Sequence, residues 1–293
     1  MLSNAYDSFA ARMQPFDVFH PTYYSKSSLN RTAGKPMVIT IHDMIDERFH
    51  QGLDAYQNII ALRAKHIHQA DKIIAVSENT KNDLIELCKV DPNKIETIYH
   101  GNSFNVNIAR FSMPKLIEQP YLLYTGKRYA YKNFERFLDS LAPIMKENNH
   151  LWLVCAGGGA FKKAELLQLN KLQLSHRVIY QPIQDNEQLA SLYNHAQCLV
   201  YPSLYEGFGL PIIEAFACGC PVITSIGSST AEIAGDAAVL IDPNNTDEMS
   251  QQIRAVLKSE LLQNQLVQLG HNRAHLFNWD KTANQTLKLY QAI

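Results

Sequence analysis

The most informative part of the sequence is Y-P-S-L-Y-E-G-F-G-L-P-I-I-E-A, Tyr201–Ala215. The apolar run Cys198–Tyr201 is typical of a short buried strand, and it leads into a loop that contains Gly207 and Gly209. Without a Cβ, these glycines let the backbone approach a ligand closely. Pro211 suits the first turn of a following helix. The sequence therefore predicts a helix N-terminus at the carboxyl edge of a parallel sheet, a place that suits a pyrophosphate.

Two carboxylates flank this loop. Glu206 precedes the helix, and Glu214 lies within it, eight residues further on. This spacing does not bring both to one spot on a helix, but it allows them to hold two ends of an elongated ligand. Ionised carboxylates only accept hydrogen bonds, so they suit a polyhydroxylated ligand. We interpret Glu206 as a contact for sugar hydroxyls and Glu214 as a contact for ribose hydroxyls; the alternative is two surface glutamates beside a turn.

The rest of the chain alternates short apolar runs with helical patterns. The runs do not alternate cleanly between apolar and polar residues, which predicts burial on both faces and parallel sheets between helices. The expected strands are Asp17–His20, Met37–Ile41, Lys72–Val76, Ile95–Tyr99, Tyr121–Thr125, Leu151–Cys155, Val178–Gln181, Cys198–Tyr201, Pro221–Thr224 and Ala238–Ile241. The expected helices include Asp54–Gln69, Glu78–Lys89, Asn133–Glu147, Glu187–His195 and Asp247–Lys258, with N-caps at Ser77 and Asp185.

A chain of 293 residues has room for about two domains. The segment Asn102–Gln119 lacks periodicity, so we expect domains over residues 1–114 and 115–278, followed by a last helix over 279–293. The second domain shows six strand signals, a complete doubly wound sheet, whereas the first shows four and looks cut short. A shortened sheet would expose an apolar edge or face. We therefore expect a second copy of the chain, another polypeptide or a preceding region to cover it.

A second motif, Y-T-G-K-R-Y-A-Y-K-N, runs from Tyr124 to Asn133. The expected strand ends at Thr125. A glycine turn then brings Lys127, Arg128 and Lys132 to the carboxyl edge of the sheet. Cations at this position can neutralise a diphosphate leaving group. The alternative is a solvated basic turn.

Composition limits the function classes. The net charge of -1 argues against a nucleic-acid partner. Five cysteines, an odd number, indicate free thiols in a reducing compartment, and no apolar run reaches the roughly 18 residues of a membrane span. We expect a soluble, cytoplasmic protein, with peripheral contact at the inner membrane left open. The sequence has no D-x-D element and no cluster of His, Asp and Glu, so we expect no metal and no other cofactor.

The segment Tyr201–Ala215 resembles the E-x7-E motif of retaining glycosyltransferases of the GT-B fold, the family 4 type. The stretch Pro202–Pro243, with S-S-T-A-E-I-A-G and A-A-V-L-I-D-P, is similar to the C-terminal domain of that family. The resemblance implies two Rossmann-like domains facing a cleft, with the last helix, residues 279–293, crossing back onto the N-terminal domain. It also implies transfer of a sugar from a UDP- or GDP-sugar to a hydroxyl of a glycan or lipid-linked acceptor, with retention, in surface polysaccharide or glycoconjugate synthesis. In the family the first Glu contacts the transferred sugar and the second the ribose, which correspond to Glu206 and Glu214.

The resemblance implies further site residues. A family Arg and Lys hold the donor phosphates; we assign them to Arg128 and Lys132, although Lys127 stands where the family has its Arg. His42 lies at the end of the expected buried strand in V-I-T-I-H-D, Val38–Asp43, and matches a His near the donor sugar and acceptor; the alternative is a capping or core histidine. The donor is further expected to lie against Gly207, Phe208, Gly209 and Leu210, above the glycine turn at Gly158, with its base read by the backbone near Ile183.

The family resemblance favours front-face attack, in which the departing phosphate helps to deprotonate the acceptor. Two other functions stay open at this point. One is a nucleotide-sugar epimerase of the same fold, whose acid and base carboxylates the sequence does not reveal. The other is a non-catalytic remnant that binds a nucleotide-sugar or a partner.

Overall fold

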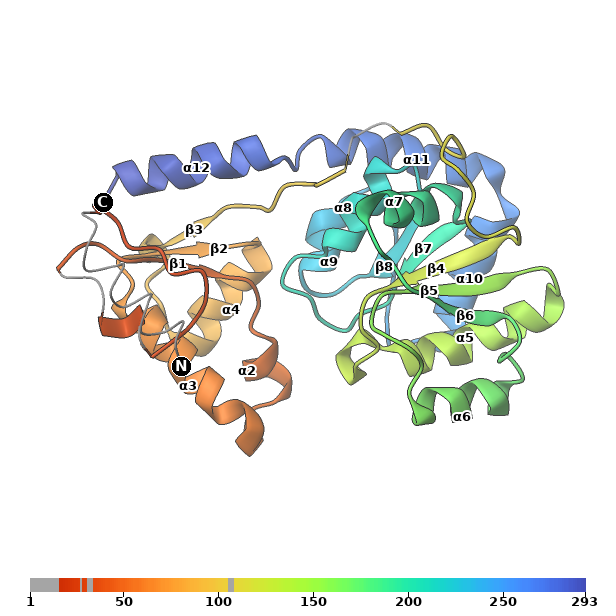
Figure 1. Cartoon of the computed structure of the whole chain (residues 1–293), viewed down its shortest axis with the longest axis horizontal. Helices are drawn as coiled ribbons and strands as arrows, with labels where there is room; N and C mark the ends of the chain where they lie inside the picture. The colour runs from red at the N-terminus through yellow and green to blue at the C-terminus, as the bar shows by residue number, and fades with distance from the viewer. Residues whose placement is uncertain (1–15, 27, 31–33, 105–107) are drawn as a thin grey trace. The chain divides into compact units, whose positions relative to one another are not determined.

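A computed structural model of the chain describes residues 16–26, 28–30, 34–104 and 108–293. By its internal contacts the chain divides into two compact units. The first unit comprises residues 1–100 together with 280–293, and the second comprises residues 101–279. Each unit is built on its own parallel sheet (Figure 1).

The second unit holds a six-stranded parallel sheet in the order β6-β5-β4-β7-β8-β9. Its strands are β4 (Tyr121–Thr125), β5 (Trp152–Ala156), β6 (Val178–Gln181), β7 (Cys198–Tyr201), β8 (Val222–Ser225) and β9 (Val239–Ile241). From β4 the chain first adds strands on one side of the sheet, then returns to add β7 and β8 on the other side. The direction therefore reverses between β4 and β7, and the carboxyl ends of these two strands form the point at which open α/β sheets bind ligands.

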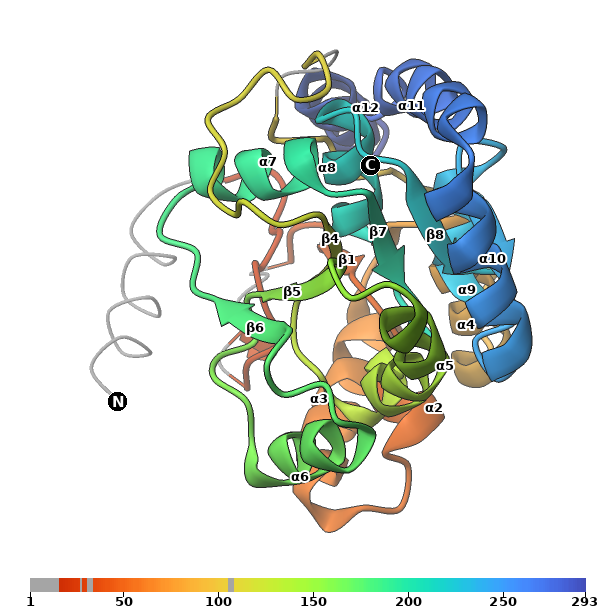
Figure 2. The same cartoon turned by 90° about the vertical axis from the view of Figure 1, so that its right-hand side faces the viewer.

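The reversal also sorts the helices onto the two faces of this sheet. Because the crossovers between parallel strands are right-handed, helices that connect strands added in one direction lie on one face of the sheet. Helices that connect strands added in the other direction lie on the opposite face. The helices are α5 (Phe134–Glu147), α6 (Lys163–Leu172), α7 (Asn186–His195), α8 (Leu210–Ala217), α9 (Ser228–Ala234), α10 (Thr246–Lys258) and α11 (Glu260–Ala274), with the 3-10 turn η3 (Ala130–Lys132). Figure 2 shows α7 and α8 on one side of the sheet and α5 and α6 on the other.

Helix α5 forms the centre of the larger core. Its buried side chains, including Phe137 and Leu141, pack with alternate residues of the sheet such as Leu122 and Leu153 and with Ile253 of α10. On the opposite face, α11 lies directly against α8, since a Cβ on Gly270 would come within 2.8 Å of the Phe216 ring. Both faces of the sheet are thus covered by helices, as the apolar strand runs predicted.

The first unit holds the three-stranded parallel sheet β1-β2-β3. Its elements are β1 (Val38–Ile41), β2 (Lys72–Ala75), β3 (Ile95–Thr97), α2 (Ile45–Phe49), α3 (Asp54–Gln69), α4 (Glu78–Cys88), α12 (Trp279–Gln291) and the 3-10 turns η1 (Ser28–Asn30) and η2 (Pro92–Lys94). One face packs against Ile67 of α3 and Leu84 of α4. The other face, which includes Val38 and Ile74, packs against Leu289 of α12.

Three expectations differ from the structure of the first unit. The expected strand Asp17–His20 forms only one parallel bridge, between Phe19 and Met37. The unit ends at His100 rather than at residue 114, because the following segment hydrogen-bonds to the second unit; Ile108 N–H, for example, donates to the Ala217 carbonyl. The small sheet does not expose an apolar face, because α12, from the far end of the chain, covers it. The expectation of an additional covering chain therefore concerns only the edge of the sheet, and it stays a prediction.

Among the described residues, no helix combines the length and the apolar character needed to cross a membrane.

The packing of α12 predicts a difference between two leucines on the same helix. Leu289 is 8% exposed and lies in the core of the first unit, whereas Leu287 is 53% exposed. We expect Leu289→Ala to lower the free energy of unfolding of the first unit by about 2–5 kcal/mol through the cavity it leaves. Leu287→Ala should change it by less than about 0.5 kcal/mol. Amide hydrogen exchange of β1, β2 and β3 measures both effects, and equal protection in the two variants would show that α12 does not stabilise the sheet.

Candidate active site

The side chains of Lys132 and Glu206 meet where the sheet of the second unit reverses direction. Lys132 follows β4 and Glu206 follows β7, which are neighbouring strands. The Lys132 Nζ atom lies 2.6 Å from Glu206 Oε1 and 2.9 Å from Oε2. The same ammonium lies 3.4 Å from the hydroxyl of Tyr201. Since both charged side chains are largely buried, their hydrogen bonds hold the two loops in one arrangement.

The loop that carries Lys132 is anchored by main-chain contacts as well. Tyr124, buried at the end of β4, donates its hydroxyl proton to the carbonyls of Lys127 and Lys132, at 3.1 and 3.3 Å. The Leu204 N–H donates to the Tyr131 carbonyl at 2.8 Å, which ties the loop after β7 to the loop after β4. The main chain of the basic loop is therefore held at both Lys127 and Lys132.

Two consecutive serines hold the backbone of Glu206. The Glu206 N–H donates to Ser228 Oγ at 3.1 Å. Ser229 Oγ, which is fully buried, lies 2.8 Å from the Glu206 carbonyl and 2.9 Å from the Phe208 carbonyl. Ser228 adopts a φ of 57°, a left-handed conformation that is unfavourable for a residue with a side chain. The arrangement thus orders Glu206 through its main chain as well as through its carboxylate.

Glu214 lies on α8 and is positioned by a tyrosine from α7. The Tyr193 hydroxyl donates to Glu214 Oε2 at 2.8 Å. Burial raises the pKa of the Glu214 carboxyl, and the hydrogen bond from Tyr193 acts in the opposite direction. Glu214 therefore occupies a partly desolvated position, where a further pair of donors, such as two ribose hydroxyls, would stabilise its ionised form.

The loop between the two glutamates leads directly into α8. Gly209 is the N-cap residue of this helix and has a φ of 107°, which favours glycine. Leu210 is the first helical residue and is 40% exposed. Gly207 and Phe208 are buried beneath it, and the Phe208 ring packs edge-on against Phe277 at 5.8 Å between centroids. The predicted strand, glycine loop and helix are all present, and the N-terminus of α8 lies beside Glu206.

Arg128 is engaged by the protein in a way that the sequence did not reveal. Its side chain is 2% exposed, and its Nε atom donates to Glu165 at 2.8 Å. Its two other nitrogens donate to the carbonyls of Gly157, Gly159 and Ala160, at 3.3, 2.7 and 3.2 Å. These contacts lock the loop after β4 to the loop after β5. The Arg128 guanidinium is therefore occupied by contacts within the chain, and its assignment to the donor phosphates stays a prediction.

Lys127 has an exposed position that suits a cation for the donor phosphates. It directly follows Gly126, its side chain is exposed, and its ammonium lies 5.3 Å from the ring centroid of Tyr129. The ammonium of Lys162 lies at the same distance from the same ring. Lys127 and Lys132 are thus the two lysines of the basic loop that border the carboxyl edge of the sheet.

Gly158 allows the two loops to meet. A Cβ on this residue would lie 2.4 Å from the Gly126 carbonyl oxygen and 3.0 Å from the Lys127 Cα atom, and its φ is 74°. Gly159 next to it has a φ of 81° but open space around the position of a Cβ. Ile183, whose backbone was expected near the base, follows β6 and is half-buried.

His42 belongs to the first unit, where it directly follows β1 and is exposed. Its Nδ1 atom lies 3.3 Å from Nε2 of His100. Partial desolvation lowers the pKa of His42, and the neighbouring Asp43 carboxylate acts in the opposite direction. Desolvation lowers the pKa of His100 to about 4, so both imidazoles are neutral at physiological pH.

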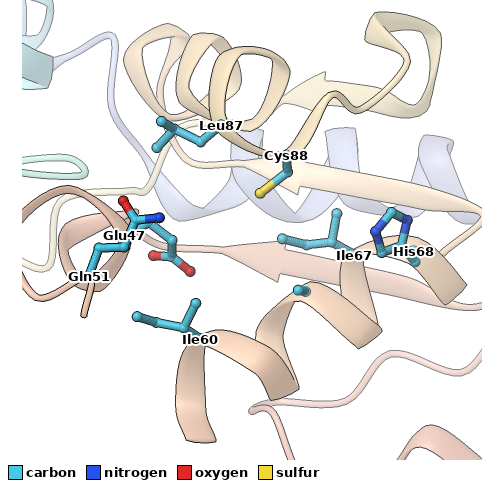
Figure 3. A pocket seen from close by; sticks show the side chains of 8 residues that line it. Glu47, Gln51, Ile60, Ile67, His68, Leu87 and Cys88 are labelled. Carbon is cyan, nitrogen blue, oxygen red and sulfur yellow. The ribbon is translucent and has the colours of Figure 1, made fainter. Parts of the chain in front are cut away.

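A separate hollow of about 310 Å³ lies among α2, α3 and α4 in the first unit (Figure 3). Its walls are mixed: Ile60 and Ile67 from α3 and Leu87 from α4 are apolar, whereas Glu47, Gln51 and His68 are polar. Its carboxylate, Glu47, already accepts a hydrogen bond from Arg63 at 2.7 Å. The hollow contains none of the expected site residues, so we do not place the chemistry there. Within the described ranges, no group of three or more His, Cys, Asp and Glu side chains is arranged to hold a metal ion.

Several residues that order this site were not singled out from the sequence: Tyr193, Ser228, Ser229, Tyr124 and Glu165. The serines lie in the S-S-T-A-E-I-A-G segment, so that motif contained a usable signal. Tyr193 and Glu165 lie in ordinary helical patterns, and their contacts depend on how the helices pack.

Comparison with solved structures defines the class of fold as GT-B. Sucrose-phosphate synthase from Thermosynechococcus elongatus superimposes with a TM-score of 0.81 over 99% of this chain and 77% of that one, at 22% identity. The Anabaena protein HepE in complex with UDP and glucose superimposes with a TM-score of 0.78 over 99% of this chain and 81% of that one, at 17% identity. The predicted fold class, with a smaller N-terminal unit, is confirmed.

The family follows from the sequence comparisons. A model described as "Glycosyl transferases group 1" matches residues 106–273, more than half of the chain, and one described as "Glycosyltransferase Family 4" matches residues 5–103. The chain therefore belongs to the group 1 glycosyl transferases. It is 28% identical to O-antigen chain mannosyltransferase B of Escherichia coli over 94% of this chain and 74% of that protein. It is 24% identical to the D-inositol 3-phosphate glycosyltransferase of Gordonia bronchialis over 94% of this chain and 66% of that protein.

The contact between the two glycine turns predicts a sharp difference between neighbouring substitutions. Alanine at position 158 or 159 costs about 1–2 kcal/mol for its left-handed backbone. Gly158→Ala additionally drives a methyl group into the Gly126 carbonyl, so it should lower the melting temperature further and weaken nucleotide binding. Gly159→Ala is the matched control. Thermal unfolding and calorimetry with UDP and GDP measure the effects, and equal losses in the two variants would contradict the close approach of the loops.

Proposed function

We propose that this chain is a retaining hexosyltransferase that moves a sugar from a UDP- or GDP-sugar to an acceptor hydroxyl. The observation that carries the proposal is the Lys132–Glu206 pair beside the N-terminus of α8, with Glu214 on that helix. This arrangement combines a cation and helix N–H groups for a diphosphate with two separate carboxylates for sugar hydroxyls.

Each part of the donor has a proposed set of contacts. Glu214 accepts from the ribose hydroxyls, and the backbone near Ile183 reads the base. Gly207, Phe208, Gly209 and Leu210 hold the diphosphate at the N-terminus of α8. Lys127, rather than Arg128, is the second cation for the phosphates, because the Arg128 guanidinium is hydrogen-bonded to Glu165 and to the Gly159 carbonyl. Glu206 contacts the transferred sugar, and His42 serves the donor sugar and acceptor.

The proposed reaction relies on positioning and charge. The bond between the anomeric carbon and the phosphate oxygen breaks, and the acceptor oxygen bonds to that carbon on the same face. The acceptor proton passes to the departing phosphate. Lys127 and Lys132 stabilise the negative charge that develops on the diphosphate, which removes the need for a metal ion.

The acceptor and setting are proposed from the relatives. The names of relatives that act on O-antigen chains support a mannosyl-type donor, a glycan or lipid-linked acceptor and a role in surface polysaccharide synthesis. The five free cysteines support a cytoplasmic location.

The experiment that tests the function is a donor panel. UDP- and GDP-hexoses are incubated with the full chain, excess EDTA and membrane extract as the acceptor source. We expect the release of UDP or GDP with one class of donor. NMR should show that the product has the same anomeric configuration as the donor. Inversion at the anomeric carbon would contradict retention, and activity that EDTA abolishes and Mn²⁺ or Mg²⁺ restores would contradict the metal-independent reaction.

Lysine variants test the charge assignment in the same assay. Lys127→Ala and Lys132→Ala should each lower turnover by about 100-fold, the scale of a lost electrostatic donor. Lys146→Ala, an exposed lysine in the last turn of α5, is the control. Arg128→Ala should instead lower the melting temperature, because it leaves three loop carbonyls without their donor. An unchanged melting temperature in Arg128→Ala would contradict the role of Arg128 in holding the loops together and favour its assignment to the donor phosphates.

The raised pKa of Glu214 predicts how nucleotide binding depends on pH. The ionised carboxylate can accept two ribose hydroxyls, and protonation removes part of that capacity. Because burial raises this pKa, nucleotide affinity should begin to fall at a higher pH than an ordinary glutamate would cause. Glu214→Gln should weaken UDP or GDP binding by about 10- to 100-fold, since a hydrogen bond to a charged group contributes about 1.5–3 kcal/mol.

Calorimetry of the wild type, Glu214→Gln and the control Glu187→Gln across pH separates this effect from titration of the nucleotide. The pH dependence should persist in the control, whose glutamate is exposed in the first turn of α7, and disappear in Glu214→Gln. The same affinity in Glu214→Gln as in the wild type would remove the ribose contact.

A further inference from the structure

His42 and His100 meet across the carboxyl edge of the small sheet. His42 directly follows β1, and His100 lies three residues beyond the end of β3. These strands are not neighbours, because β2 runs between them. Adjacent strands are about 4.8 Å apart, so the two main chains are about 10 Å apart and only the side chains close the distance. The two imidazoles thus form a bridge over the end of β2.

The geometry of the bridge is that of a hydrogen bond. The Nδ1 atom of His42 lies 3.3 Å from the Nε2 atom of His100. The ring planes are 18° apart and the centroids 5.3 Å apart. His42 is exposed and can reach a ligand, whereas His100 is half-buried behind it. Burial holds the pKa of His100 near 4 and lowers the pKa of His42, so one neutral ring donates and the other accepts.

A hydrogen bond at one nitrogen of a neutral imidazole determines which nitrogen carries the proton. If His100 Nε2–H donates to His42 Nδ1, the proton of His42 must be on Nε2. His42 then presents an N–H donor outward, which suits the oxygen acceptors of a sugar or diphosphate. The other titratable groups that face His42 are the adjacent Asp43 and His20, whose Nε2 atom lies 3.0 Å from Thr40 Oγ1.

We propose that His100 is a positioning residue that holds His42 as the Nε2-protonated tautomer and orients that N–H for the ligand. The assignment of His42 to the reaction rests on the proposed function. The contact at 3.3 Å fits donation in either direction, so the choice of the Nε2 tautomer also rests on the proposed ligand, whose oxygen acceptors suit an outward N–H. That His100 holds His42 in a single tautomer does not rest on it, because this is a property of the chain without donor or acceptor.

The test uses the full chain and two substitutions of His100. His100→Gln places an amide N–H near the position of Nε2, whereas His100→Phe keeps a flat ring without a donor. Long-range proton–nitrogen NMR correlations identify the protonated nitrogen of each histidine, and the His42 signals are assigned by their loss in His42→Gln. Thermal unfolding shows that each variant is folded.

At pH 8 we expect His42 to be protonated at Nε2 in the wild type and in His100→Gln, and to show a mixture of tautomers in His100→Phe. A wild type with the proton on Nδ1, or the same single tautomer in all three proteins, would overturn the inference. In the transfer assay, His100→Phe should lower kcat about 10-fold with little change in the donor KM, and His100→Gln should recover most of the loss. An intact tautomer pattern with no change in kcat would leave the positioning of His42 in place and count against the role of His42 in the proposed reaction.

Discussion

The ion pair between Lys132 and Glu206 is the interaction on which the site of the second unit depends. It joins the ends of β4 and β7, the two strands between which the sheet reverses direction. Partners that are this far from solvent are strongly coupled, because removal of one would leave the other charge poorly solvated. The surrounding contacts all serve to keep these two loops in register: Tyr124 beneath the basic loop, Leu204 across it, and Ser229 behind Glu206.

The same constraint orders Glu206 through three separate contacts. Glu206 is held at its carboxylate by Lys132, at its N–H by Ser228 and at its carbonyl by Ser229. A site whose reaction depends on orientation benefits from groups that need little rearrangement when the substrate binds. The unfavourable φ of Ser228 is consistent with this function, since strained residues persist where the surrounding structure determines their conformation.

The arginine and the lysines of the basic loop make different kinds of contact. A planar guanidinium with several donors can satisfy a carboxylate and several carbonyls at once, and Arg128 does so between the loops after β4 and β5. Lysine presents a single compact charge on a flexible stem, which suits Lys127 at the exposed rim and Lys132 at the buried pair. The residue types thus match the contacts that each side chain makes: several carbonyls and a carboxylate for Arg128, and one carboxylate for Lys132.

Features that depend on neighbours along the chain could be predicted from the sequence. The apolar runs predicted nine of the ten strands closely, and the caps at Ser77 and Asp185 lie where local hydrogen bonding places them. Glu206, Gly209 and Glu214 could be read from one segment because a strand, a turn and a helix follow one another there. The contacts between distant segments became visible only in the folded structure. Arg128 meets Glu165 across 37 residues, and His42 meets His100 across 58. Periodicity carries no information about such pairs, because their geometry arises only when separate strands and helices pack against one another.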